Sequence, residues 1–128
     1  MTYYFAKTLV GSFDEVVART REALARQGFG VLTEIDVAAT LRAKIGAEIA
    51  PYLILGACNP SLAYEALQLE DKVGTMLPCN VVVRDAGDGR TEVAAIDPVA
   101  SMSAIPNPML KKQAAIVADK LAAVVADI

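Results

Sequence analysis

Two Cys-Asn steps are the residues of this chain whose types and spacing could do chemistry. Cys58-Asn59 and Cys79-Asn80 contain its only cysteines, and a proline stands within two residues of each. The thiolate form of cysteine is a nucleophile and a ligand for soft metals. An apolar, strand-like run leads into Cys58, and another departs from Cys79. The pattern therefore predicts that both thiols lie near one end of a sheet.

The two thiols are expected to differ in their roles. Cys58 comes just before a predicted helix start, where unpaired N–H groups and the helix dipole stabilise an anion. We therefore expect Cys58 to be the more nucleophilic thiol and Cys79 to be the resolving thiol or a second contact. Asn59 and Asn80 would orient a bound ligand. The competing interpretation is that each cysteine is a small buried hydrophobic residue and that Asn59 only caps the helix.

Lys44 is the remaining candidate for ligand binding. Its ordinary explanation is a lysine near a helix end that complements the helix dipole. The carboxylates fall at predicted surface or turn positions, where charged side chains are usually only solvated; they are Glu65, Glu70, Asp71 and Asp97.

The absence of histidine removes several classes of function. Serine and cysteine hydrolases that need a histidine base are excluded within this chain, as is the commonest nitrogen ligand of metals. Two cysteines are too few for a structural zinc site with four ligands, so we assign no metal ligands. A dimer that pools four cysteines, or Cu(I) with fewer ligands, stays open. No glycine-rich phosphate loop is present, and the sequence names no cofactor.

Composition favours one soluble domain over residues 1–128. The chain has 128 residues and is 55% apolar, but its longest uncharged stretch, residues 49–64, is interrupted by prolines and glycine and could not span a bilayer as one helix. The first residues lack the features of a secretory signal, so we expect a cytoplasmic protein with two free thiols at rest. A net charge of −3 with scattered basic residues argues against nucleic acid as a partner.

The first half of the chain predicts two strands and two helices. Residues 3–10 and 29–35 have strand-like patterns. Ser12 followed by Glu15 is a capping box, and the helix that it starts ends at Gly28. Asp36 caps a shorter helix, which runs to about Ile45.

The second half predicts three further strands and two helices. Residues 48–57 hold a buried strand with Cys58 at its exit, and Asn59 caps a helix over residues 61–69. A loop over residues 71–77 leads to a hairpin of residues 79–84 and 91–96, and Pro78 is expected in the trans form. A long helix covers residues 109–128. The order predicts an α+β two-layer sandwich, a mixed and mainly antiparallel sheet of about five strands with helices packed on it.

The cysteine motifs also carry a family resemblance. They read Leu-Gly-Ala-Cys-Asn-Pro over residues 55–60 and Leu-Pro-Cys-Asn-Val-Val-Val over residues 77–83, and Ile-Asp-Pro follows at residues 96–98. With these motifs, nearly the whole chain resembles the uncharacterised family called domain of unknown function 302. The resemblance implies a small α+β domain of bacteria and archaea, often a homodimer, without an established activity. It supplies no catalytic residues to carry over.

Two hypotheses for function follow. In the first, a small homodimer binds a small-molecule ligand or handles thiol or sulfur redox chemistry through Cys58 and Cys79. In the alternative, the chain is a non-enzymatic homodimeric interaction module with structural cysteines, which associates through an apolar surface such as that of its alanine-rich final helix.

Overall fold

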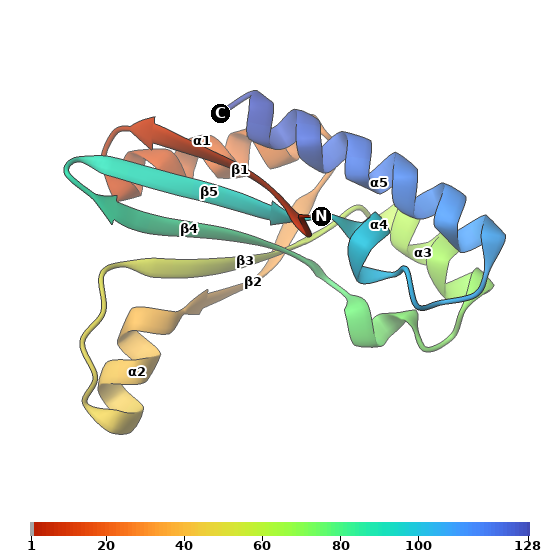
Figure 1. Cartoon of the computed structure of the whole chain (residues 1–128), viewed down its shortest axis with the longest axis horizontal. Coiled ribbons are helices and arrows are strands. Elements are labelled where there is room, and N and C mark those ends of the chain that lie inside the picture. The colour runs from red at the N-terminus through yellow and green to blue at the C-terminus, as the bar shows by residue number, and fades with distance from the viewer. Residues whose placement is uncertain (1) are drawn as a thin grey trace.

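The centre of the molecule is a five-stranded antiparallel sheet with the order β1-β5-β4-β3-β2 (Figure 1). We describe residues 2–128 of a computed structural model. The strands are β1 (Tyr4–Val10), β2 (Gly30–Asp36), β3 (Tyr52–Cys58), β4 (Cys79–Gly87) and β5 (Arg90–Ile96). Every neighbouring pair in this sheet is antiparallel. The sheet, which was expected to be mixed and mainly antiparallel, is therefore antiparallel throughout.

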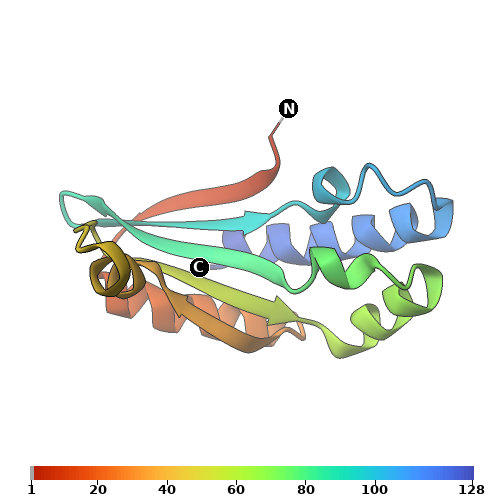
Figure 2. The same cartoon turned by 90° about the horizontal axis from the view of Figure 1, so that it is seen from below.

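The helices are distributed unequally around the sheet. They are α1 (Phe13–Arg26), α2 (Val37–Ile45), α3 (Pro60–Leu69), the short 3-10 helix η1 (Val73–Met76), α4 (Pro98–Ser101) and α5 (Pro108–Ala126). Both long helices, α1 and α5, cover the same face of the sheet, as Figures 1 and 2 show. The predicted α+β sandwich is therefore confirmed, with one helical layer.

Local capping explains where the helices begin. Ser12 accepts a hydrogen bond from the N–H of Glu15, as the capping box predicts. Asp36 accepts from the N–H of Ala39 and starts α2, and Gly46 ends it in the left-handed region at a φ of 67°. These ends lie where the sequence predicts them, because each depends on residues within one turn.

The main core lies between the sheet and the two long helices. Alternate residues of the central strands point to this side and are fully buried, among them Leu55, Val81 and Val93. Val16 of α1 and Leu121 of α5 close the core from the helical side.

A second core cluster extends beyond one end of the sheet, where α3, α4 and η1 gather against the first half of α5. Its buried residues are Ala66, Val73, Met102, Leu110 and Ala114. The sequence pattern predicts α3 but neither η1 nor α4, because each of these two has only four residues and no period to detect. This second cluster matters because it forms the far wall of the pocket described below.

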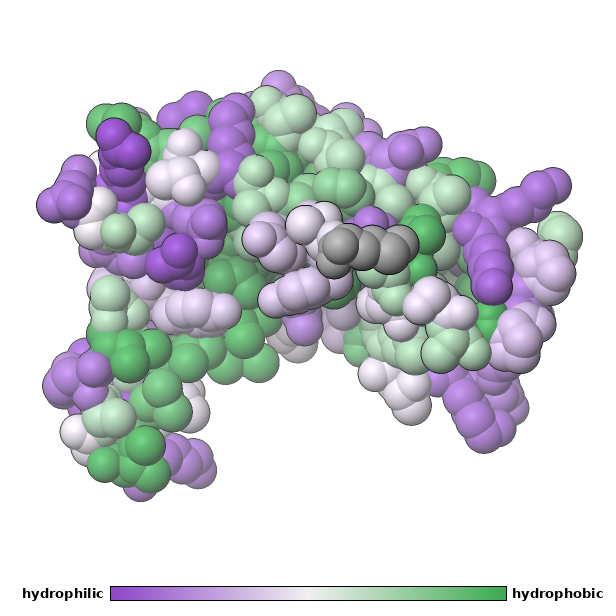
Figure 3. All heavy atoms as spheres, in the orientation of Figure 1, coloured by the Kyte–Doolittle hydropathy of each residue, from purple (hydrophilic) through white to green (hydrophobic). Residues whose placement is uncertain are grey.

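The opposite face of the sheet has no helical layer. In Figure 2 the strands lie in front of the long helices, and α2 lies on the same side of the molecule as the strands. Apolar side chains are exposed here and on α2, including Tyr4, Ile35 and Ile45. Figure 3 shows hydrophobic surface in green over α2 and along the adjoining edge of the sheet.

Three local predictions are corrected by the structure. The peptide bond between Leu77 and Pro78 is cis, so the expected trans form is wrong. The buried strand within residues 48–57, predicted at the apolar run 51–56, spans Tyr52–Cys58 and so extends further towards α3 than predicted. The hairpin turn predicted over residues 85–90 is shorter than expected. Strand β4 continues to Gly87 and β5 begins at Arg90. The turn residues Asp88 and Gly89 both have positive φ.

None of the helices formed by residues 2–128 has the length and apolar character needed to cross a membrane.

Candidate functional site

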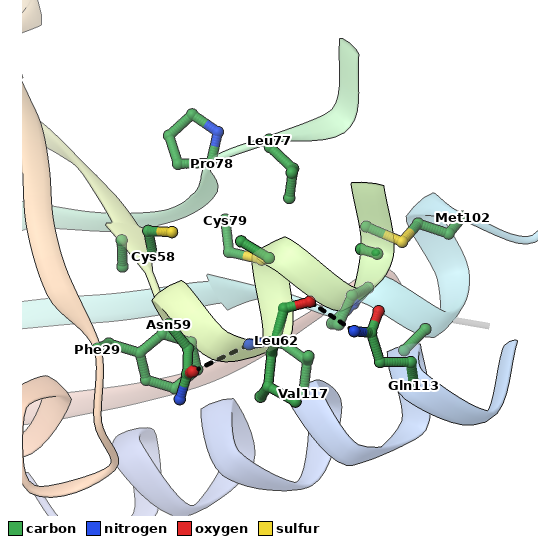
Figure 4. A pocket seen from close by; sticks show the side chains of 15 residues that line it. Phe29, Cys58, Asn59, Leu62, Leu77, Pro78, Cys79, Met102, Gln113 and Val117 are labelled. Atoms are coloured by element: carbon green, nitrogen blue, oxygen red, sulfur yellow. Dashed lines mark hydrogen bonds between the residues drawn. The ribbon is translucent and has the colours of Figure 1, made fainter. Parts of the chain in front are cut away.

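Both cysteines line one apolar pocket at the end of the sheet (Figure 4). Its walls come from the end of β3, the start of α3, the segment before β4, α4 and α5. The cavity has a volume of about 40 Å³. The sequence predicts that both thiols lie near one sheet end, and the structure places them there.

The junction of β3 and α3 positions Cys58. This cysteine is the last residue of β3, and Asn59 next to it is the N-cap of α3. The Asn59 side-chain oxygen accepts a hydrogen bond of 3.3 Å from the N–H of Leu62, and Pro60 occupies the first helical turn. The cap thereby holds the half-buried Cys58 directly before the positive end of the helix.

The pairing of β3 with β4 positions Cys79. Ala57 is the direct cross-strand partner of Cys79, so Cys58 lies one residue further along β3. Strand spacings of about 5 Å across and about 3.4 Å along place the Cα atoms of the two cysteines about 6 Å apart. That separation lies within the range of disulfides, roughly 4.4–6.8 Å. Both are free thiols here.

Burial distinguishes the two thiols electrostatically. Cys79 is only 7% exposed. Burial, and secondarily the charge of Cys58, raises the pKa of Cys79 to about 11. Cys79 therefore keeps its proton at neutral pH.

The structure does not bring all the predicted site residues together. Asn80 points to the uncovered face of the sheet, where it borders a broad hollow with Tyr4 and Arg84. Lys44 is exposed on α2, away from the pocket. Ligand binding by Asn80 or Lys44 stays a prediction, and it would concern other surfaces than the one beside the thiols.

Two pocket residues were missed by reasoning from sequence. Met102 of the unpredicted segment around α4 and Gln113 of α5 are both buried and line the pocket. One signal for Gln113 was present, because it falls on the apolar stripe of the final helix, between Leu110 and Val117. A polar side chain on such a stripe needs a partner, and Gln113 donates a hydrogen bond to the backbone oxygen of Leu62.

The described part of the chain holds no group of three or more Cys, Asp or Glu side chains that could bind a metal ion.

Comparison with known proteins gives a family and a fold. The family model described as "Domain of unknown function DUF302" matches residues 5–128. A crystal structure of an uncharacterized conserved DUF302 protein from Bacillus stearothermophilus is similar over 99% of this chain and 98% of that chain, with 30% identity and a TM-score of 0.92. No curated protein matches. The resemblance drawn from the cysteine motifs is confirmed.

Proposed function

Because this chain belongs to the DUF302 family, whose function is not established, we propose from its own geometry that Cys58 and Cys79 form a redox-active thiol pair. The observation that carries this proposal is that the two cysteines, from paired strands, line one apolar pocket. The estimated Cα separation of about 6 Å lies within the disulfide range. Because neighbouring residues of a strand point to opposite faces and Ala57 is the residue opposite Cys79, closing the disulfide requires a local rearrangement where β3 meets α3.

The two thiols have different parts in the proposed reaction. Cys58 is half-buried and stands at the helix start, so its thiolate attacks the oxidant. With hydrogen peroxide, the O–O bond breaks and Cys58 becomes a sulfenic acid, while the hydroxide that leaves takes up the proton that Cys58 had released and becomes one water. The sulfur of Cys79 then attacks the sulfur of Cys58, and the S–O bond breaks. Hydroxide leaves and takes the proton of Cys79 to form a second water.

A cytoplasmic location, as predicted, suits this cycle because the reducing compartment would return the disulfide to two thiols. The high pKa of Cys79 keeps the buried thiol from competing with Cys58 for the oxidant, and its attack on Cys58 depends on the transfer of its proton to the leaving hydroxide.

Thiol counting and peptide mass spectrometry test the proposal. One equivalent of hydrogen peroxide should consume both thiols and produce a peptide that links Cys58 to Cys79. The Cys79→Ser variant should instead accumulate a sulfenic acid on Cys58, which dimedone traps, and Cys58→Ser should be oxidised slowly. If both thiols of the unaltered protein react only after unfolding, the proposal is wrong.

A second candidate function is a homodimeric interaction module. The observation in its favour is the uncovered sheet face, which carries Tyr52, Val82 and Ala94. Its charged residues Arg84 and Glu92 pair with each other at 2.7 Å. The hollow on this face therefore holds no excess charge that would repel a second copy.

Light scattering coupled to size-exclusion chromatography tests this second candidate. We expect a dimer at micromolar concentration and a monomer for Val82→Glu. Met109→Glu, on the exposed side of α5, is the matched control and should leave the dimer intact. Cys58→Ser and Cys79→Ser should also leave it intact if the cysteines are only structural. A monomeric unaltered chain would exclude this function.

A further inference from the structure

Cys58 and Cys79 are the only lining residues of the pocket that can become anionic ligands. None of the other lining residues has a side chain that titrates, and the polar side chains among them are Asn59 and Gln113. The side-chain oxygen of Asn59 already accepts the N–H of Leu62. The pocket therefore presents two thiol sulfurs in surroundings that are otherwise almost wholly apolar.

This ligand set discriminates strongly between metal ions. Magnesium and calcium require about six or more oxygen ligands, which the pocket lacks. Zinc requires about four ligands, and residues 2–128 contain no cluster of three or more Cys, Asp or Glu side chains suited to a metal. Cu(I) is selected by soft sulfur ligands and needs fewer of them, so two thiolates suffice. The number and type of ligands therefore favour Cu(I).

The burial of Cys79 adds to this discrimination. Burial raises the pKa of Cys79 to about 11, so its proton competes with any metal ion for the sulfur at neutral pH. Only an ion with a high affinity for thiolate can displace that proton. Cys58 is half-buried and accessible, so it can receive the ion first and the buried thiol can then complete the coordination.

The placement of the two thiols suits an ion held between them. Figure 4 draws the sulfur of Cys58 on the side that faces Cys79, with no labelled side chain between the two. A metal–thiolate bond is about 2.3 Å long, so an ion in linear coordination spans sulfur atoms about 4.6 Å apart. A disulfide requires about 2 Å between them. A metal bridge therefore needs less rearrangement where β3 meets α3 than a disulfide does.

We propose that each chain binds one Cu(I) ion between the sulfur atoms of Cys58 and Cys79. The ion is transferred from a complex with two small thiolates, which leave and take up the protons that the two cysteines release. Two thiolates and one Cu(I) carry one net negative charge, and it lies at the start of α3, where the helix dipole stabilises an anion. The inference goes beyond the redox function, because it needs the reduced thiols and no oxidant.

Metal titration of the unaltered, reduced protein is the first test. Cu(I) is added without oxygen in competition with bathocuproine disulfonate, and X-ray absorption reports the ligands of the bound ion. We expect one Cu(I) per chain with two sulfur neighbours, and no retention of Zn(II) offered alone. One Cu(I) per two chains, oxygen or nitrogen neighbours, or equal retention of Zn(II) would each overturn the proposed site. Cu(I) binding without disulfide formation by peroxide would remove the redox function alone, and the reverse result would remove the metal site alone.

Single variants of the sulfur-containing residues are the second test, after circular dichroism has shown that each is folded. Cys58→Ser and Cys79→Ser should each weaken Cu(I) binding by more than about a hundredfold, the upper range for loss of a residue that only supports a ligand. Met102→Leu removes the other sulfur that lines the pocket at similar volume and should bind Cu(I) as the unaltered protein does. Unchanged binding in either cysteine variant, or an equal loss in Met102→Leu, would overturn the two-thiol site.

Discussion

Gly56 and Pro78 lie against each other next to the thiol pocket, and a Cβ added to Gly56 would be 2.8 Å from the Cγ of Pro78. The same Cβ would also clash with the side-chain oxygen of Thr33. Gly56 of β3 pairs with Asn80 of β4, one residue after Cys79. The missing side chain therefore allows Pro78 to lie over the sheet and lead the chain into the cysteine.

Replacing Gly56 by alanine should consequently destabilise the protein. We expect Gly56→Ala to lower the free energy of unfolding by about 1–3 kcal/mol, because the proline ring cannot yield as a flexible side chain would. Urea denaturation measures this change. Gly74→Ala, where no atom lies within 4 Å of the added group, is the control and should be near neutral. Equal stability of both variants would contradict the close packing.

Stability should depend on alkaline pH through Cys79. Its pKa is raised to about 11 in the folded protein, above its ordinary value of about 8.5. The folded state then binds more protons than the unfolded state between these values. The resulting stabilisation is complete below pH 8.5 and is lost as pH rises towards 11.

Urea denaturation at pH 8 and pH 10.5 measures this effect. The unaltered protein should lose about 1–3 kcal/mol more than Cys79→Ala over this interval. Other titrating groups are common to both proteins and cancel in the comparison. Parallel pH profiles would show that Cys79 titrates normally.

Asn59 should contribute to stability as a helix cap. Asn59→Ala removes the acceptor for the N–H of Leu62 and should lower the free energy of unfolding by about 1 kcal/mol. Asn59→Asp keeps a capping oxygen and should retain most of the stability that the cap contributes. Asn80→Ala is the control, because it removes an asparagine at an exposed position of β4. An effect of Asn80→Ala as large as that of Asn59→Ala would count against the cap.

Lys7 should fasten the end of α5 to the edge strand β1. Its Nζ donates to the backbone oxygens of Ala126 and Ile128 at 3.1 and 3.0 Å. Lys7→Ala should therefore lower the free energy of unfolding by about 1 kcal/mol and increase amide exchange in the last turn of α5. Lys44→Ala, at an exposed position of α2, is the control. Unchanged exchange in Lys7→Ala would rule out this attachment.

Several features of this protein could be predicted from sequence because they depend on neighbouring residues. Ser12 and Asp36 cap their helices through hydrogen bonds within one turn, so their patterns suffice. Asn59 also caps its helix within one turn, and its pattern therefore predicts that Cys58 lies directly before α3. Cys79 at the first residue of a strand likewise follows from the apolar run after it.

Other features depend on contacts between segments that are distant in sequence. The pocket needs Gln113 of α5 and Met102, which follows α4, to meet the two cysteines, and no local period encodes that meeting. The cis form of Pro78 was also missed, because the trans form is the local default for such a bond.

The sequence by itself determined the number of strands, the main helices, the two thiols and the absence of histidine chemistry, since these follow from residue type and short-range spacing. Only the tertiary structure decided that Cys58 and Cys79 share one pocket while Asn80 and Lys44 face elsewhere. The register of β3 against β4 sets which side chains meet, and packing of the helices sets which of them are buried. Burial, in turn, raises the pKa of Cys79 and makes the two thiols unequal.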